Sequence, residues 1–354
     1  MRYFLYVYLL FFNINFLSAQ EIQSKSRIDE IVVTAEFNDI DAFNISSSIS
    51  IISENDISKR NANHLEDLLF ITPNVNYSSG ASRGKFYQIR GIGERSEFTE
   101  PVNYSVGVII DGIDFTGIAL GASTFDVKQI EILRGPQGTL YGANALAGLI
   151  NIVSNDPTED FYSEISGSIS EFGGKDFGII ISNSNDNNFG YRLGFKNSKS
   201  DGFVKNVYLN RDDTNDIDET ISRAKFTKNN DTTKLTLNIF YADIDNGYDA
   251  FSLDNTRTTY SDEPGYDRQK TTAASTKFEK TLRNNNTIEI LASFSDSELG
   301  YAYDEDWSNT GICEKTPCDS TLFGFDWWYS SFDSFNRDNT NHSIDLRYIS
   351  NSEN

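Results

Sequence analysis

Few side chains in this sequence of 354 residues could perform covalent or metal chemistry. Its two cysteines, Cys313 and Cys318, lie in the stretch GICEKTPCDS, and its two histidines are His64 and His342. A zinc site is disfavoured because neither histidine lies near the cysteine pair. If the chain is exported, the two cysteines are expected to form a disulfide across a short polar loop that contains Pro317.

Common catalytic motifs are missing as well. The sequence contains no GxxxxGK[ST] phosphate loop and no HExxH helix. We therefore expect no enzyme, no cofactor and no metal. Nucleic acid is also not expected as a partner, because 52 acidic residues outnumber 30 basic ones and give a net charge of −22, whereas phosphate recognition needs a clustered basic surface.

The first 19 residues, MRYFLYVYLLFFNINFLSA, have the pattern of a secretory signal peptide. A basic residue precedes an apolar run from Tyr3 to Phe12, and small residues come before a polar stretch. Asn13 and Asn15 interrupt the apolar run, whereas a membrane-spanning helix needs about 20 apolar residues. A membrane anchor is the less favoured alternative.

Residues 37–156 mix helix and strand patterns and predict a compact α+β unit. A helix is expected to begin after Glu54 and Asn55 and to end at Pro73. Its apolar side is formed by Ile57, Leu65, Leu68 and Leu69. Strands are expected at 87–92, 106–111, 130–135 and 148–154.

After Pro157 the sequence changes to long segments in which apolar and polar residues alternate. In KLTLNIFYADI, Leu235, Leu237, Ile239 and Tyr241 share one face, and Phe240 interrupts the polar face. The segments TIEILASFSDS, YRLGFKNS and HSIDLRYIS repeat the pattern. Because successive side chains of a strand point to opposite sides, each segment has one apolar and one polar surface.

A soluble β-sandwich would show the same alternation, but two features favour a membrane barrel. The polar sides carry charges, and the strands run for about 9 to 11 residues, which is enough to cross an outer membrane when tilted. Long loops at 243–272 and 297–341 also alternate with short turns at 183–188 and 228–233, as in barrels with short periplasmic turns.

An ordered series of motifs resembles the TonB-dependent receptors of the Gram-negative outer membrane. The series comprises DEIVVTA (29–35), IRGIG (89–93), VGVIIDGI (106–113) and IEILRGPQGTLYGANALAGLINIVS (130–154). The resemblance implies an α+β plug domain followed by an antiparallel transmembrane β-barrel. The expected organisation is a signal peptide (1–19), an N-terminal segment with the TonB box (20–36), the plug (37–156) and part of an outer-membrane barrel (157–354).

The TonB box implied by this resemblance consists of Glu30, Ile31, Val32, Val33 and Thr34. Such a segment, rich in β-branched residues, can add as a strand to the sheet edge of a partner. The expected partner is the TonB complex of the inner membrane. Composition alone favours an ordinary first strand of the plug, whereas the position after the signal and the resemblance favour the TonB box.

Three plug residues are candidates for a latch between plug and barrel. Arg90 and Arg134, each followed by glycine, occupy positions where the family uses plug arginines against barrel acids, and Glu131 lies near Arg134. The alternative is that these charges are solvated or paired within the plug. The glycines of the same motif allow tight turns and close backbone approach inside a lumen.

Ligand binding is expected on the outward side of the molecule. Candidates in plug loops are Tyr77, Arg83 and Phe115, and candidates in the aromatic stretch 301–335 are Trp307, Trp327 and Trp328. Flat rings beside acidic residues could stack on sugars or on aromatic chelators. Some of these rings could instead belong to the aromatic girdle at the membrane surface.

The resemblance implies energised uptake of a scarce small solute such as an iron chelate, a vitamin or a glycan, through a barrel embedded in outer-membrane lipid. An adhesin or signalling receptor with the same plug is the alternative, although only residues 20–28 separate the signal from the TonB box. Plugged barrels of about 22 strands need on the order of 220 residues before loops. Residues 157–354 suggest roughly eight strands, so a fragment of a longer receptor is expected. A small closed barrel of about eight strands could not hold the plug.

Overall fold

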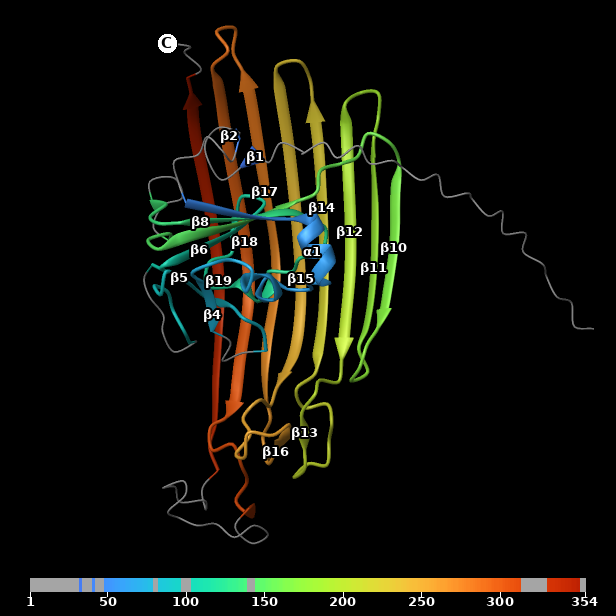
Figure 1. Ribbon diagram of the computed structural model, residues 1–354. Coiled ribbons are helices and arrows are strands. Elements are labelled where there is room, and N and C mark those ends of the chain that lie inside the picture. Colours follow the sequence, from blue (N-terminus) through green and yellow to red (C-terminus); the bar gives the residue numbers. More distant parts are fainter. Residues whose placement is uncertain are drawn as a thin grey trace, which may run out of the picture.

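The computed structural model describes residues 48–78, 82–96, 103–138, 144–312 and 330–350, and the backbone of residues 32–33 and 40–41. It contains a small mixed unit, the plug, and a sheet of long strands, the wall (Figure 1). The plug elements are β3 (Ser48–Ser53), α1 (Glu54–Arg60), α2 (Glu66–Leu69), β4 (Val75–Ser78), β5 (Phe86–Ile89), β6 (Val106–Ile110), β7 (Ile113–Asp114), η2 (Ala119–Gly121), β8 (Val127–Arg134) and β9 (Gly148–Ser154). The wall strands are β10 (Tyr162–Ile169), β11 (Lys175–Ser184), β12 (Phe189–Ser200), β14 (Ile217–Asn229), β15 (Thr233–Tyr248), β17 (Gly265–Thr281), β18 (Thr287–Asp304) and β19 (Phe332–Ile349).

The plug is built on a sheet with the order β3-β8-β9-β6-β7, in which only the β6–β9 pair is parallel. A separate antiparallel pair is formed by β4 and β5. The strands predicted at 130–135 and 148–154 become the central neighbours β8 and β9. These two strands are buried for nearly their whole length, which explains their apolar sequences.

The single helix predicted from residue 55 to Pro73 is two short helices. The Ser53 hydroxyl caps α1 by accepting a hydrogen bond from the backbone N–H of Asp56. The Asp56 carboxylate in turn accepts a hydrogen bond from the backbone N–H of Ser53. Asn61 then adopts a left-handed conformation with φ 49°, which ends the first helix. The predicted apolar residues are nevertheless buried, namely Ile57, Leu65, Leu68 and Leu69.

The wall is one antiparallel sheet with the order β10-β11-β12-β14-β15-β17-β18-β19. Short turns at 185–188, 230–232 and 282–286 lie at one end of the sheet. The connections 201–216, 249–264 and 305–331 lie at the other end, so the predicted asymmetry of the loops is confirmed. These connections are shorter than predicted because the strands extend into them. Two of them are joined by a parallel bridge between β13 (Lys205–Asn206) and β16 (Thr258–Thr259).

Alternation along the wall strands separates an outer apolar face from an inner polar face. On β15, Leu235 and Ile239 are each 41% exposed, whereas Asn238 and Ala242 are buried on the inner side. Phe240 interrupts the polar inner face, as predicted: it points inward, and its ring meets that of Phe115 edge-on at 5.0 Å. Other large apolar side chains exposed on the wall include Ile165, Ile169, Phe177, Leu193, Phe195, Ile290, Ile344 and Leu346.

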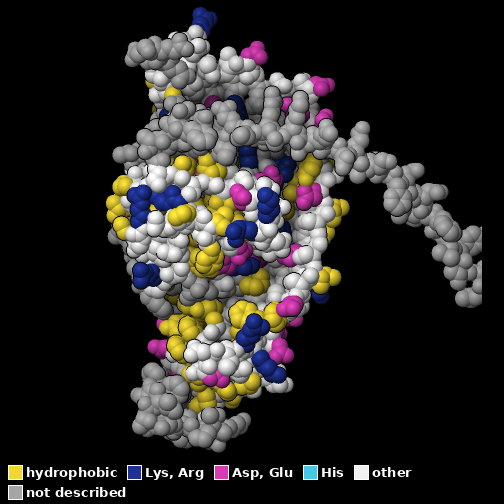
Figure 2. Space-filling model, viewed as in Figure 1, with side chains coloured by type: hydrophobic (Ala, Val, Ile, Leu, Met, Phe, Trp, Pro, Cys, Tyr) yellow, Lys and Arg dark blue, Asp and Glu magenta, His cyan; other side chains and the backbone are white. Residues whose placement is uncertain are grey.

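The plug lies across the inner face of the wall strands (Figure 1). Apolar residues of the wall, including Phe240, Ala242 and Ala273, join the core of the plug in one cluster. Figure 2, in the same view, shows basic, acidic and hydrophobic side chains intermixed over the plug. Among the described residues, no helix has the length and apolar character that a membrane span requires.

Gly148, at the start of β9, offers a test of the packing of the plug. A Cβ atom at this position would lie 2.3 Å from the carbonyl oxygen of Leu133 and 2.6 Å from Cδ1 of Ile89. We expect Gly148→Ala to destabilise the β8–β9 pair by about 2 kcal/mol or more, because a backbone atom must move. Hydrogen exchange of the β8 and β9 amides in the intact protein measures the effect. Gly138→Ala is the control, because a Cβ there would meet nothing within 4 Å; equal protection in both variants would contradict the described packing.

Candidate functional site

The candidate functional site is the plug–wall interface, which we define as the contacts between the plug and the inner face of the wall strands. Polar groups dominate its described contacts, and most of its charged side chains are nearly inaccessible to solvent. Burying a charge is costly unless it is paired and hydrogen-bonded. The way in which these charges are paired therefore determines how firmly the plug is held.

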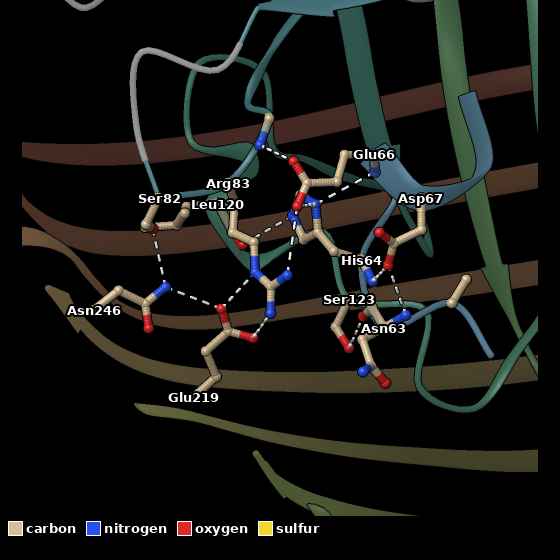
Figure 3. A network of polar contacts seen from close by, with 12 residues as sticks. Asn63, His64, Glu66, Asp67, Ser82, Arg83, Leu120, Ser123, Glu219 and Asn246 are labelled. Atoms are coloured by element: carbon tan, nitrogen blue, oxygen red, sulfur yellow. Dashed lines mark hydrogen bonds and ion pairs between the residues drawn. The ribbon is translucent and has the colours of Figure 1, made fainter. Parts of the chain in front are cut away.

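The first charged contact joins Arg83 of the plug to Glu219 of β14 (Figure 3). Two guanidinium nitrogens donate to the two carboxylate oxygens, at 2.8 Å from Nε and 3.0 Å from Nη2. A third nitrogen, Nη1, lies 3.4 Å from Oε1 of Glu66. Burial lowers the pKa of Arg83, but the charge of Glu219 outweighs it and holds the pKa above its ordinary value. This bidentate geometry is the strongest form of a charge-assisted pair.

Glu66 is held in place by the structure around the first turn of α2. His64 Nε2 lies within 3.3 Å and 3.2 Å of the carbonyl oxygens of Ala119 and Leu120, which places the proton on that nitrogen (Figure 3). Asp67 accepts a hydrogen bond from the backbone N–H of His64 at 3.1 Å. These contacts tie the beginning of α2 to η2, so that Glu66 faces the Arg83 guanidinium.

The second charged contact joins Lys85 of the plug to Asp267 of β17. Lys85 Nζ lies 2.9 Å from Oδ1 of Asp267, whose side chain is fully buried. The other carboxylate oxygen, Oδ2, accepts from the backbone N–H and hydroxyl of Ser82 at 2.8 Å and 2.9 Å. Lys85 Nζ also lies 5.3 Å from the centre of the Tyr301 ring, a cation–π contact. Both carboxylate oxygens of Asp267 are therefore satisfied by the plug.

Deeper in the interface the sense of the pairing reverses, because the wall supplies the cations. Arg192 of β12 holds Asp126 of the plug through both carboxylate oxygens, with Nε 2.9 Å from each. On β14, Arg223 Nη2 donates to the carbonyl oxygen of Ser123 at 2.8 Å. Lys225 Nζ donates to the carbonyl oxygen of Ser154, also at 2.8 Å.

Asp111, which follows β6, supplies the negative charge between these two cations. Its Oδ2 lies 3.8 Å from Nη1 of Arg223 and its Oδ1 lies 3.7 Å from Nζ of Lys225. Its carbonyl oxygen accepts from the hydroxyl of Ser275 on β17 at 2.6 Å. Asp111 has a positive φ of 49°, next to Gly112, so the turn at the end of β6 directs its groups toward the wall.

The wall is thus zoned by charge along its strands. Glu219 and Asp267 lie near the ends of β14 and β17 that meet the long loops. Arg192 and Lys225 face each other across β12 and β14 nearer the short turns. The plug carries the complementary charge in each zone, so it fits the wall in one orientation only.

The three residues predicted as a latch do not make these contacts. Arg134 donates to the carbonyl oxygen of Pro73 at 3.1 Å and to Ser48 and Ser50 of β3, all within the plug. Arg90 is exposed. Burial, and then the charge of Arg90, lower the pKa of Arg134. The expectation that these two arginines pair with acids is therefore wrong for the described wall strands.

Glu131, the third residue of the predicted latch, is completely buried in the plug sheet. It accepts hydrogen bonds from Gln129 at 2.6 Å and from Asn151 at 3.0 Å. Its central place in β8 makes it part of the polar interior of the plug.

The predicted ligand residues fall into different environments. Arg83 is engaged in the interface, and Phe115 is 0% exposed and packed on Phe240, so the expectation of an accessible ligand contact is wrong for both in this conformation. Tyr77 is half-buried and lies edge-on to Phe70 at 5.6 Å. Burial raises the pKa of the Tyr77 phenol, and Glu66 and Asp67 raise it further.

Trp307 is 40% exposed and stacks on Phe251 at 4.6 Å. It closes a group of rings at the long-loop end of the wall, which we name the aromatic group: Tyr248, Phe251, Tyr301, Tyr303 and Trp307. Trp327 and Trp328 lie outside the described residues, as do Cys313 and Cys318.

Only two residues of the predicted TonB box fall within the description. Val32–Val33 form the short strand β1, which pairs antiparallel with β2 (Ile40–Asp41). Glu30, Ile31 and Thr34 lie outside the described residues. Figure 1 places β1 and β2 near the short-turn end of the wall, opposite the long loops.

Sequence reasoning missed most residues of the interface. Arg192, Arg223 and Lys225 were visible only as charges on the polar sides of amphipathic strands. Asp111 and Asp126 lie in turns and match no motif by themselves. The useful signal was charge on the inner face of a wall strand, because such a charge must find a partner in whatever fills the lumen.

Residues 41–149 match the family model described as the TonB-dependent receptor plug domain. The chain is 28% identical over 155 residues to the vitamin B12 transporter BtuB of Vibrio vulnificus strain CMCP6. The aligned region covers 43% of this chain and 24% of that protein. The chain is also 32% identical over 130 residues to the pesticin receptor of Yersinia pestis, and this aligned region covers 36% of the chain and 19% of that receptor. The chain thus matches about a quarter or less of the length of these relatives.

Solved structures show the same fold at lower identity. The ferric yersiniabactin uptake receptor FyuA from Yersinia pestis superposes with a TM-score of 0.63 at 20% identity, over 73% of this chain and 42% of that one. The siderophore receptor PiuA from Acinetobacter baumannii superposes with a TM-score of 0.62 at 19% identity, over 78% and 40%. Residues 41–149 are thus a plug domain of the TonB-dependent receptor family, and this plug lies on the inner face of antiparallel strands in a fold shared with these outer-membrane receptors.

Proposed function

We propose that the protein takes part in the energised uptake of a scarce solute across the outer membrane. The observation that carries this proposal is the plug–wall interface. A plug that is held on the inner face of a barrel by buried, paired charges obstructs the lumen, and it does not leave by thermal motion alone because each departing charge would lose its partner. Passage of a solute therefore requires work on the plug.

The segment around Val32–Val33 is proposed to receive that work. It is a short strand near the short-turn end of the wall, on the side away from the long loops. A strand of β-branched residues can pair with the sheet edge of a partner, where backbone hydrogen bonds resist a pulling force. The proposed partner is the TonB complex, which would pull on residues 30–34.

The opposite side of the plug is the proposed entrance for the solute. Lys85 and the aromatic group meet there, with Trp307 the most exposed of the rings. Flat rings beside charges suit solutes that have both aromatic or sugar faces and polar edges. Ferric siderophores, vitamins and glycans all have this character.

The names of similar proteins support the same class of activity. The relatives and neighbours are named as a vitamin B12 transporter, a pesticin receptor and siderophore receptors. An adhesin or signalling receptor with the same plug remains the alternative reading. Ligand binding without any energised transport would favour it.

Replacing Val32 by proline tests the proposed point of pulling. Proline removes the backbone N–H and cannot pair along a strand edge, so we expect energised uptake to be abolished while ligand binding at the cell surface stays near normal. Uptake of the labelled solute by whole cells, compared with binding in cells without an energised inner membrane, separates the two effects.

Val32→Ile is the matched control, because it keeps a β-branched side chain and the backbone N–H, and it should transport normally. If Val32→Pro also transports normally, residues 30–34 are not the point of pulling. Because the change is remote from the plug–wall contacts, reduced ligand binding in Val32→Pro would also contradict this assignment.

Glu219→Gln tests whether the buried pair holds the plug. The substitution keeps the shape of the side chain but leaves the Arg83 guanidinium without its main counter-charge, and we expect opening of the plug to become easier by about 3 kcal/mol. Hydrogen exchange of the plug amides at 82–89 in the intact receptor measures this opening.

Asp218→Asn is the matched control, since Asp218 is the preceding residue on the other face of β14. Its ion pair with Lys199 is solvent-exposed, with 40% and 57% of the two side chains accessible, so exchange should stay unchanged. Equal exchange in the two variants would show that the Arg83–Glu219 pair does not hold the plug.

A further inference from the structure

The turn before β8 places the ring of Phe125 against the inner face of the wall. A Cβ atom added at Gly194 of β12 would lie 2.9 Å from Cε1 and 3.4 Å from Cζ of this ring. A Cβ atom added at Gly178 of β11 would lie 3.5 Å from Cε2, on the opposite edge of the ring. One plug side chain therefore occupies the space that two neighbouring wall strands leave open. We call this arrangement of Phe125, Gly178 and Gly194 the Phe125 contact.

The backbone does not require glycine at either of these wall positions. Gly178 and Gly194 lie inside antiparallel strands, and neither has a positive φ. Both are buried on the inner face. Glycine inside a strand weakens the strand, and it often marks a place where another group approaches closely. The close approach of the Phe125 ring accounts for both glycines.

The turn that carries Phe125 is fixed on both sides. The hydroxyl of Thr124 donates to the carbonyl oxygen of Ala62 at 2.6 Å. On the other side, Asp126 has a left-handed conformation with φ 56°, and its carbonyl oxygen accepts from the backbone N–H of Asn155 at 3.1 Å. The ring therefore moves with the body of the plug, so its place on the wall determines the place of the plug.

Successive inner positions of β12 each meet a different plug residue. In order from residue 196 to residue 190 of β12, the plug residues are Asn63, Phe125, Asp126 and Pro157. Arg192 and Lys196 have long side chains that can follow a partner as it moves. The ring of Phe125 has no such freedom. A displacement of the plug by one inner position, about 7 Å along the strand, would place the ring against Arg192 or Lys196.

We propose that Phe125 is a positioning residue that sets how far along the wall the plug lies. The charged contacts select the orientation of the plug, and the Phe125 contact selects its position along β11 and β12. Closely packed groups tolerate little displacement, because overlap of atoms is costly. The proposal concerns the closed conformation alone, so it goes beyond the proposed uptake and does not depend on it.

A larger side chain on the wall, combined with removal of the ring, tests the proposal. Gly194→Val suits a strand but overlaps with the ring, so the wall should fold and the plug should be displaced. Hydrogen exchange of amides 123–127 in the intact receptor should become faster by at least about tenfold. Phe125→Ala alone should also accelerate it, because the packing of the ring is lost. The double variant should return to within about threefold of the unchanged receptor, because valine fills the vacated space.

Gly190→Val is the matched control, because Gly190 lies on the same face of the same strand, four positions away. The atoms nearest to an added Cβ there belong to Pro157, Thr227 and Ser184, the first at 2.7 Å. Phe125→Ala should add to the effect of Gly190→Val and should not correct it. Equal correction of Gly190→Val and Gly194→Val would reduce the effect to general relaxation of the plug and overturn the proposal. Unaltered exchange in Gly194→Val, or no correction by Phe125→Ala, would overturn it as well.

Phe125→Ala keeps the test decisive if valine at position 194 prevents folding, because it leaves the wall unchanged. Folding of each variant is checked by its heat-modifiable migration on gels. Recovery of folding in the double variant would support the Phe125 contact. Exchange in Phe125→Ala equal to that of the unchanged receptor would overturn it.

A second measurement rests on the proposed function and relates the Phe125 contact to obstruction of the lumen. Cells with Gly194→Val should lose resistance to a large polar antibiotic such as vancomycin, and the double variant should restore it. Faster exchange without loss of resistance would overturn the obstruction of the lumen proposed above, while the exchange itself would still support the Phe125 contact.

Discussion

The structure depends on charges that are buried between two parts of the same chain. Isolated in a lumen, the Arg83 guanidinium or the Asp267 carboxylate would each carry a large cost of lost hydration. Across the plug–wall interface, Arg83 is paired with Glu219 and Asp267 is paired with Lys85, both with good geometry. Such pairs contribute little net free energy beyond what desolvation removes, but breaking one is costly. These pairs therefore fix the position of the plug more than they stabilise it, which suits a plug that is proposed to be both held and removable.

Much of the fold was predictable because it rests on local patterns. The alternation along KLTLNIFYADI places Leu235 and Ile239 outside and Asn238 inside, and a strand has no other way to arrange it. The apolar stretches at 130–135 and 148–154 could only be buried strands. The glycine-rich motif between them carried the family resemblance, and the match to the plug domain confirmed it.

The contacts of the site could not be predicted, because they join segments that are far apart in the chain. Arg83 and Glu219 are separated by 136 positions, and no local pattern relates them. Phe115 was expected at the surface, but it is buried against the inner face of the wall, where its ring packs on Phe240. The break between α1 and α2 was missed because an asparagine, and not a glycine or proline, takes the left-handed conformation at residue 61. The pairing of Arg83 and the burial of Phe115 depend on tertiary structure, whereas the helix end at Asn61 is a local conformation that its residue type signals only weakly.

The zoning of charge along the wall has a consequence for the open lumen. When the plug is drawn away, Glu219 and Asp267 near the outer mouth and Arg192 and Lys225 further in lose their counter-charges together. The inner face of the described wall strands then carries unpaired acidic groups toward the long-loop end and unpaired basic groups toward the short turns, a polarity that runs along the strands. In the proposed uptake cycle, this polarity would attract a plug of complementary charge back into the same orientation.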